Sequence, residues 1–284
     1  MNMLPFKKIF SAVAFAGAVM ASPMSHADAV INPVFEPGLN TVQDSDVDRV
    51  LRNGAVTTSG TFEVGDVFQS ILRFETVNSD AINSAVGTLD YGLWAYSAVQ
   101  IATKVGVDLT GDGAIDAFNI TYKASGVLSD PGVMIELYEA DAKTNFLAQA
   151  PDIGIANVRN LNQIAEFGIL EADDFWTATI PLLIQDLNKP LGSGQLPSGV
   201  FGLSTLTNAG NLPITKNGIE GKDGNLHDIV GDASAFPRET GVNGGWLIST
   251  NTNVSFNNVP EPSPLALLGA AVLLGGMTRR RRSV

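Results

Sequence analysis

A loop of alternating aspartates holds the residues whose types and spacing best fit a chemical task. Residues 108–116 read DLTGDGAID and place side-chain oxygens at the first, third, fifth and ninth positions. Alternate residues of a tight loop can surround a hard cation such as Ca²⁺, and a glycine at the sixth position allows the sharp turn. The sequence therefore predicts a calcium site with these ligand positions: Asp108, Thr110, Asp112, Ala114 (through its carbonyl), Asp116 and Asn119.

Two positions depart from the EF-hand pattern. Thr110 stands where Asp or Asn is usual, and Asn119 stands where a bidentate glutamate is expected. The flanking residues have the composition of strands, so the motif resembles the calcium loops of extracellular β proteins and dockerin-like segments more than a helix–loop–helix sensor. Gly-Asp-Gly is also strong turn chemistry, so a β-hairpin turn without metal is the alternative.

Residues that could support an enzyme are few. Apart from His26 near the N-terminus, His227 is the only histidine, and no serine lies in a Gly-x-Ser-x-Gly context. Asp173 and Asp174 could supply the paired carboxylates of a glycoside hydrolase, but neighbours on a strand point to opposite faces. The chain has no cysteine, which excludes disulfides, thiol nucleophiles and thiolate metal sites. We expect a protein that is not an enzyme, with a carboxylate-dependent glycoside hydrolase as the second alternative.

Three tryptophans offer a different chemistry. Trp94, Trp176 and Trp246 could stack on sugar rings if their faces were exposed, with calcium holding a nearby loop. Tryptophans in β domains are more often part of the core. A calcium-stabilised, lectin-like carbohydrate-binding module is therefore the first alternative to a protein without catalytic activity.

The elements that must position these residues are mainly strands. Short runs rich in Val, Ile, Thr, Phe and Tyr alternate with Gly, Asn, Asp, Ser and Pro, which is typical of an all-β protein. We predict an antiparallel β-sandwich-like domain over residues 28–258. The clearest predicted strands are 91–105, 114–124, 133–139, 200–207 and 245–256, whereas 30–48 is predicted to be irregular and 157–165 to hold one short helix.

The N-terminus has the features of a secretory signal peptide. Lys7 and Lys8 precede an apolar stretch, residues 9–21, and small residues follow around Ser25-His26-Ala27. A basic start, an apolar core of this length and a small-residue exit predict export with cleavage after Ala27. Residues 1–27 are thus assigned to the signal peptide, and cleavage after Ala29 is the second choice.

The C-terminus, residues 259–284, has three parts with different physical properties. Pro260-Glu261-Pro262 is a stiff, extended segment because both prolines fix φ. The 13 uncharged residues 265–277 predict a hydrophobic, membrane-inserted helix that is shorter than an ordinary membrane span. A block of four like charges then stays on the cytoplasmic side of the bilayer: Arg279, Arg280, Arg281 and Arg282.

This tail resembles that of the PEP-CTERM family of Gram-negative bacteria. The resemblance rests on Val259-Pro260-Glu261-Pro262-Ser263, the apolar run and the arginines, in that order. It implies recognition by an exosortase at the membrane, transient membrane anchoring, and delivery to the cell surface or extracellular matrix. The body is broadly similar to flocculation-associated members of that group, although no motif in residues 28–258 carries the likeness.

Charge limits the partners of the exported body. Six of the 17 basic residues lie in the two ends, as does one of the 29 acidic residues, so the body carries a formal charge of about −17. Such a field repels nucleic acid and anionic membranes, favours solubility and attracts divalent cations. The leading hypothesis is an exported, non-enzymatic surface or matrix protein that acts with exopolysaccharide in adhesion, biofilm or floc formation.

Overall fold

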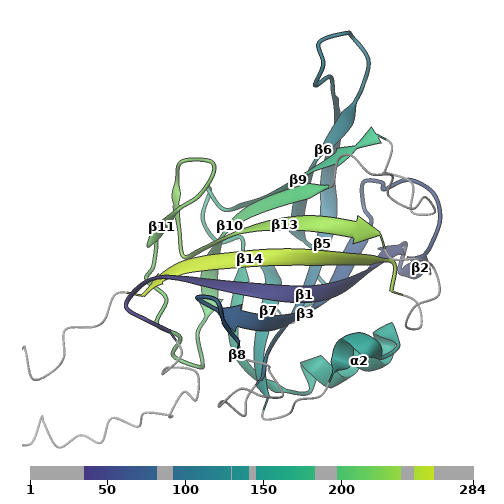
Figure 1. Cartoon of the computed structure of the whole chain (residues 1–284). Coiled ribbons are helices and arrows are strands. Elements are labelled where there is room, and N and C mark those ends of the chain that lie inside the picture. The colour runs from purple at the N-terminus through teal and green to yellow at the C-terminus, as the bar shows by residue number, and fades with distance from the viewer. Residues whose placement is uncertain are drawn as a thin grey trace, which may run out of the picture. The chain divides into compact units, whose positions relative to one another are not determined.

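The computed structural model describes residues 35–81, 92–128, 130–140, 145–182, 197–237 and 246–258. These residues all lie in one unit, residues 31–284, and form mainly antiparallel strands (Figure 1). Two short helices are described, η1 (Phe146–Ala148) and α2 (Pro151–Arg159). The strands are β1 (Gly38–Arg52), β2 (Ala55–Thr57), β3 (Val67–Val77), β4 (Asp80–Ala81), β5 (Gly92–Val107), β6 (Ala117–Ala124), β7 (Val133–Ala140), β8 (Asn162–Gly168), β9 (Phe175–Pro181), β10 (Ser198–Thr207), β11 (Ile219–Glu220), β12 (Leu226–His227), β13 (Ile229–Pro237) and β14 (Ile248–Asn258).

The main sheet closes on itself. Its strands follow the order β3-β1-β14-β13-β10-β8-β7-β5, and β5 returns to pair with β3. The long strands β5 and β10 change partners along their length: β5 pairs with β7 and then β6, while β10 pairs with β9 and then β8. Eight strands therefore surround the interior in both halves, which makes an antiparallel barrel-like sheet.

The predicted mainly β, antiparallel fold is confirmed, but the sheet forms a barrel rather than two stacked layers. Period-two alternation puts apolar residues on one face of each strand and is the same in a sandwich and a barrel. What distinguishes them is the closing pair of ladders, β1 with β14 and β3 with β5. The β1–β14 ladder joins residues far apart in sequence, such as Gly38 and Asn258, and local patterning does not report it.

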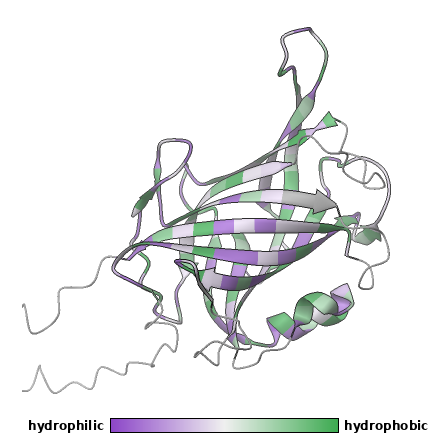
Figure 2. Cartoon of the chain, in the orientation of Figure 1, coloured by the Kyte–Doolittle hydropathy of each residue, from purple (hydrophilic) through white to green (hydrophobic). Residues whose placement is uncertain are grey.

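The two faces of the barrel wall pack against different partners. Inward-facing residues such as Leu72, Leu93 and Phe201 form the interior core. Outward-facing residues of the same strands, Ile71, Trp94 and Tyr96 among them, pack with η1 and α2 in a second core. Figure 1 shows α2 lying outside the barrel wall. Figure 2 shows the resulting alternation of hydrophilic and hydrophobic residues along the strands.

Strand β1 is the main departure from the predicted elements. Residues 30–48 were expected to be irregular, yet Gly38–Arg52 is one 15-residue strand between β3 and β14. Its inner face is polar, with Asp44, Asp46 and Asp48 all buried. Polar residues at inward positions hide the apolar alternation by which a strand is recognised. The ladders on both sides stabilise it instead.

The helix predicted over residues 157–165 lies earlier in the chain. α2 spans Pro151–Arg159, with proline in its first turn, and β8 begins at Asn162. Val158 belongs to α2, whereas Ile164 and Ala165 belong to β8, so the apparent helical spacing joined two elements. β13 is a further strand that the sequence analysis did not predict.

Candidate functional site

The predicted calcium loop forms the tip of the β5–β6 hairpin, which projects from the barrel (Figure 1). Asp108 accepts backbone N–H hydrogen bonds from Gly111 at 2.6 Å and from Gly113 at 2.7 Å. The amide of Gly113 is the main cause of a lowered Asp108 pKa, since it stabilises the carboxylate. Asp116 accepts the N–H groups of Leu109 and Thr110 at 2.8 and 3.0 Å. These carboxylates therefore order the turn by themselves.

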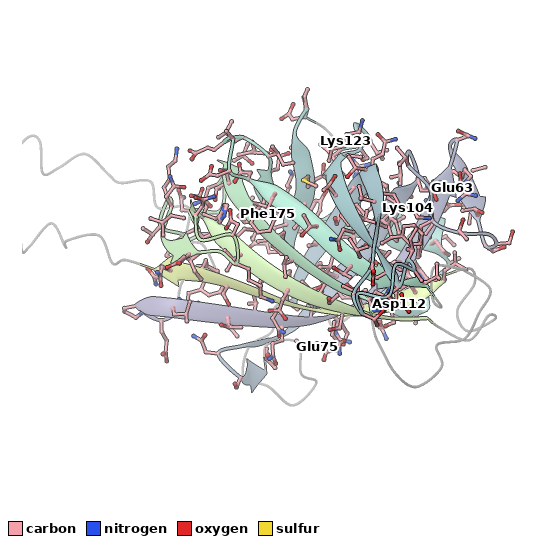
Figure 3. All side chains as sticks on the ribbon, turned by 90° about the horizontal axis from the view of Figure 1, so that it is seen from above. Glu63, Glu75, Lys104, Asp112, Lys123 and Phe175 are labelled. Carbon is pink, nitrogen blue, oxygen red and sulfur yellow. The ribbon has the colours of Figure 1, made fainter. Side chains whose placement is uncertain are left out.

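Of the other predicted calcium ligands, Asp112 lies in the hairpin tip and Asn119 lies outside it. Asp112, labelled in Figure 3, accepts the N–H of Ala114 at 2.8 Å. Asn119 lies on β6, where its side-chain oxygen accepts a hydrogen bond from the Thr179 hydroxyl of β9 at 3.0 Å. The structure therefore brings the positions 108–116 together at the tip and leaves Asn119 on the barrel wall. Among the described residues, no three His, Cys, Asp or Glu side chains gather as a metal site would require.

His227 lies in the short strand β12 and is buried. Its Nε2 lies 3.1 Å from Asp223 Oδ1, and its Nδ1 lies 3.6 Å from Asp174 Oδ1. The backbone approaches so closely that a Cβ at Gly202 would lie 2.4 Å from the imidazole ring. The ring also meets Phe175 edge-on at 5.4 Å between centroids. The imidazole is thus a packed, carboxylate-flanked core group.

Asp174, one of the two carboxylates considered for a glycoside hydrolase, accepts hydrogen bonds that stabilise the fold. Asp174 Oδ2 accepts the backbone N–H groups of Leu170 and Glu171 at 2.8 and 2.7 Å, which closes the turn before β9. Its Oδ1 accepts a hydrogen bond from the Ser204 hydroxyl at 3.1 Å. These hydrogen bonds give Asp174 a structural task next to His227.

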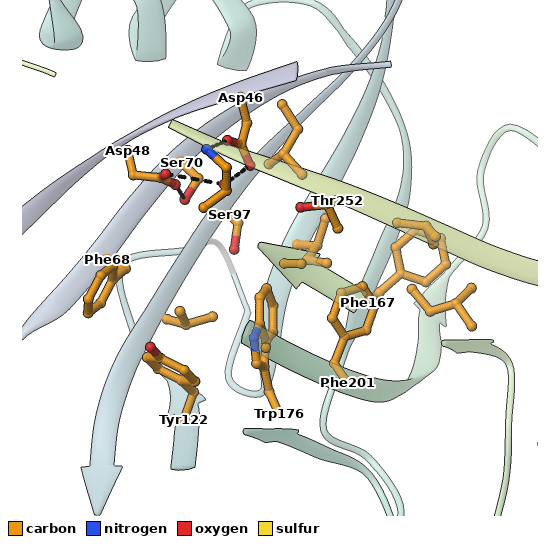
Figure 4. A pocket seen from close by; sticks show the side chains of 18 of the residues that line it. Asp46, Asp48, Phe68, Ser70, Ser97, Tyr122, Phe167, Trp176, Phe201 and Thr252 are labelled. Atoms are coloured by element: carbon orange, nitrogen blue, oxygen red, sulfur yellow. Dashed lines mark hydrogen bonds between the residues drawn. The ribbon is translucent and has the colours of Figure 1, made fainter. Parts of the chain in front are cut away.

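Two of the three tryptophans belong to the core outside the barrel wall. Trp94 is 1% exposed and packs edge-on against Phe146, with 4.7 Å between ring centroids. Trp246 is 2% exposed and its Nε1 donates to the carbonyl of Gln149 at 2.8 Å. Neither presents a face on which a sugar could stack. Trp176 is half-buried and points into the barrel (Figure 4).

The interior of the barrel contains a cavity of about 170 Å³ that the sequence analysis did not find. Its wall is mainly aromatic and aliphatic, and Figure 4 shows Phe68, Tyr122, Trp176, Phe167 and Phe201 around it. Three of these rings are in contact with one another. The ring centroid of Tyr122 lies 5.7 Å from that of Phe68 and 6.1 Å from that of Trp176. A cavity with such a wall favours apolar ligands.

A row of carboxylates from β1 forms the polar part of this interior. Asp46 and Asp48 line the cavity, and Asp44 precedes them on the same face of the strand. Asp48 accepts hydrogen bonds from the hydroxyls of Ser70 on β3 and Thr250 on β14. Asp46 accepts from the backbone N–H and hydroxyl of Thr250 (Figure 4).

Asp44 is the least satisfied of the three carboxylates. Its Oδ1 accepts the N–H of Thr252 at 2.6 Å, but its buried Oδ2 has no hydrogen-bond partner among the described residues. Burial, followed by the charge of Asp46, raises the pKa of Asp44 well above its usual value. The sequence signal was the period-two spacing of aspartates at 44, 46 and 48, which was not recognised because the segment was expected to be irregular.

Replacing Asp44 by asparagine is expected to raise stability at neutral pH. Because the folded-state pKa is raised, the native protein binds its proton more tightly, and stability falls as pH rises from about 4 through the folded-state pKa. Asp44→Asn removes this fall, so its melting temperature should exceed that of the wild type by a few degrees at pH 7–8. Thermal unfolding between pH 4 and 8 measures the effect. The exposed Asp130→Asn should keep the wild-type pH profile, and an unchanged profile in Asp44→Asn would contradict the prediction.

The two chain ends that carry the sorting predictions lie outside the described residues. This applies to Ala27 and the signal peptide, to Pro260-Glu261-Pro262, to the apolar run and to the four arginines. No helix among the described residues combines the length and apolar character needed to cross a bilayer. Within the described part, β1 and β14 bring Gly38 and Asn258 together as a register pair.

Comparisons with known proteins bear on the C-terminus. No curated protein matches the chain. One solved structure, described as a nonspecific heme-binding cyclase that catalyses a 4 + 2 cycloaddition during neoabyssomicin biosynthesis, is 11% identical, covers 98% of this chain and 91% of its own, and has a TM-score of 0.27. No inference rests on so low a score. Residues 258–282 match the family model of the PEP-CTERM protein-sorting motif, so this chain is an exported protein that carries the PEP-CTERM signal for exosortase.

Proposed function

We propose that the exported body acts without catalysis at the cell surface or in the extracellular matrix, with exopolysaccharide, in adhesion, biofilm or floc formation. The observation that carries the proposal is the PEP-CTERM sorting motif at residues 258–282, placed directly after the last strand of a folded, acidic body. A protein delivered by exosortase reaches the surface or the extracellular space of a Gram-negative bacterium. A soluble, strongly charged barrel is suited to a hydrated polymer layer.

The β5–β6 hairpin offers a surface for matrix contact. Its tip projects from the barrel and is exposed, with Leu109 59% and Ile115 49% accessible beside the carboxylates of Asp108, Asp112 and Asp116. Exposed apolar residues beside acidic ones can contact both the ring faces of a polysaccharide and its bound cations. We therefore assign the hairpin tip as the first contact between the body and the polymer.

Calcium binding by residues 108–116 of the hairpin tip, without Asn119, is part of this proposal. Addition of Ca²⁺ to the wild type is expected to raise its melting temperature through the linkage between binding and folding, and Asp112→Ala should abolish that rise. Asp112 makes the fewest hydrogen bonds of the three loop carboxylates, so its loss disturbs the metal-free turn least. The absence of any Ca²⁺ effect on the wild type would remove calcium from the proposal.

The lectin-like alternative depends on tryptophan platforms. Trp94 and Trp246 are buried, and Trp176 faces the interior cavity, so none of the three offers an exposed ring on the barrel exterior. Sugar binding by stacking is therefore the weaker candidate, and binding through the hairpin is preferred.

One experiment tests the proposal in the native host. Pro260-Glu261-Pro262 is replaced by three alanines, and a second strain has residues 108–116 replaced by a two-residue turn. The first variant should stay in the membrane fraction at the mass of the tail-bearing protein, and flocculation should be lost. The hairpin variant should reach the surface normally and still flocculate poorly. Surface delivery of the alanine variant, or normal flocculation of a strain that lacks the protein, would overturn the proposal.

A further inference from the structure

We propose that the barrel interior is a binding site for a small, mainly apolar molecule of about single-ring size that carries a hydrogen-bond donor, an amine or a hydroxyl. None of the residues that line this site belongs to the hairpin tip 108–116 or to residues 259–284. It is built from three features of the described residues: the volume of the cavity, its aromatic wall, and the carboxylate row on β1.

The volume sets the size of the ligand. A cavity of about 170 Å³ is too large to be a packing defect in a close-packed interior. An engineered apolar cavity of about 150 Å³ in another protein stays dry and takes up benzene. The barrel interior is therefore large enough for one ring with a short substituent, and too small for a sugar chain or a multi-ring cofactor without repacking.

The wall sets the apolar body of the ligand. Phe68, Tyr122 and Trp176 point into the interior from three different strands and keep partial exposure because they border the cavity. Tyr122 packs edge-on with both Phe68 and Trp176, so the three rings form one continuous aromatic side of the cavity. Ala178 and Ala233 also line the cavity, where larger side chains would fill the space. Small residues at these positions keep the interior open.

The carboxylate row sets the donor group. Asp46 and Asp48 line the cavity, and Asp44, which is buried and is not a lining residue, precedes them on the same strand and adds a third carboxyl group to the row. Carboxylates that lie close together in a buried site repel one another, which costs free energy. None of the described residues that line the cavity is Lys, Arg or His. A ligand that brings an N–H or O–H group relieves this cost, and a ligand that brings a further anion increases it.

Four probes of one shape separate these contributions. Benzylamine and benzyl alcohol carry a donor, toluene carries none, and benzoate carries a negative charge. With the full chain, each probe at a hundredfold excess over its Kd should raise the melting temperature by about 5–10 °C if it binds the folded state. The expected order of affinity is benzylamine, then benzyl alcohol, then toluene, with no binding of benzoate. Calorimetric titration gives the Kd values.

Two variants with matched controls place the binding in the barrel. Ala178→Leu fills the cavity and should weaken benzylamine at least tenfold without lowering the melting temperature. Thr179→Leu changes the next residue of β9, on the outer face, and should bind like the wild type. Asp44→Asn should weaken benzylamine while it leaves toluene unchanged.

The outcomes decide the proposal in both directions. Equal binding of benzoate and benzylamine, unchanged binding in Ala178→Leu, or no stabilisation by any of the four probes would overturn it. Loss of benzylamine binding in Ala178→Leu together with retained binding in Thr179→Leu would support it. Neither result depends on flocculation or on the sorting motif, so this site can fail while the proposed surface function stands.

Discussion

Gly168→Ala is expected to destabilise the body by about 3 kcal/mol, because overpacking of a buried strand costs this much when the backbone has to move. Gly168 ends β8 opposite Val133 of β7, at an irregular point in their register. A Cβ added there would lie 2.0 Å from the carbonyl oxygen of Gly132. That oxygen accepts the N–H of Ile169 at 3.1 Å, so a shift of the backbone would also break a hydrogen bond.

Equilibrium unfolding in urea measures the effect, with Gly199→Ala as the matched control. Gly199 is also a strand glycine, on β10, and a Cβ there would meet its nearest neighbour at 3.4 Å, an ordinary contact. The control should stay within about 0.5 kcal/mol of the wild type or gain slightly from lower entropy of the unfolded chain. Equal stability of Gly168→Ala and Gly199→Ala would show that β7 and β8 are further apart at this point than described.

Arg52→Ala is expected to cost about 2–3 kcal/mol because it leaves the buried carboxylate of Asp66 without its cation. Arg52 Nε and Nη2 donate to the two oxygens of Asp66 at 2.8 and 2.7 Å, and Nη2 also donates to the carbonyl of Thr61 at 2.6 Å. The Asp66 side chain is 2% exposed, whereas that of Arg52 is 30% exposed. The hydrogen bonds to Asp66 are also the main cause of a raised Arg52 pKa.

The same substitution should open one end of the barrel. Arg52 binds Thr61 and Asp66 of the segment 58–66. This segment also holds the buried Phe62 against Phe68 at the cavity wall, with 5.2 Å between ring centroids. Lys104 Nζ also donates to the carbonyl of Phe62 at 2.7 Å, and Figure 3 shows Lys104 and Glu63 at this end. In limited proteolysis, Arg52→Ala should be cleaved within residues 58–66 faster than the wild type. The cleavage rate of Arg52→Lys should lie between those of the wild type and Arg52→Ala. Wild-type cleavage rates in Arg52→Ala would contradict this role.

The sequence predicted the parts of the protein whose signals are local. The sorting motif is a run of adjacent residues with distinct charge and stiffness, and it is confirmed at residues 258–282. Strand content followed from alternation, and the hairpin at Asp108–Asp116 followed from turn chemistry. These features depend on neighbours within a few residues.

What the sequence could not give depends on contacts between distant residues. Closure of the barrel requires β1 to pair with β14, and nothing near Val42 indicates that its partner is Val254. Asp46 and Asp48 belong to a segment that was predicted to be irregular, whereas hydroxyls from β3 and β14 bind their carboxylates inside the barrel. His227 resembled a loop residue because its burial depends on Gly202, a distant glycine that leaves space for the ring. In the last two cases a polar residue is buried by a partner elsewhere in the chain.

The pairing of the first and last long strands has a consequence for the timing of folding. Since ribosomes make a chain from its N-terminus, β1 must wait with an unpaired edge until β14, the final strand before the sorting motif, has been completed. Ladders between residues more than 200 positions apart form slowly, and a waiting edge can pair with the wrong chain. The residues that finish the barrel are thus followed immediately by those that engage the exosortase. A chain truncated before β14 would lack both the strand that closes the barrel and the sorting motif. Incomplete molecules would therefore not be sorted to the surface.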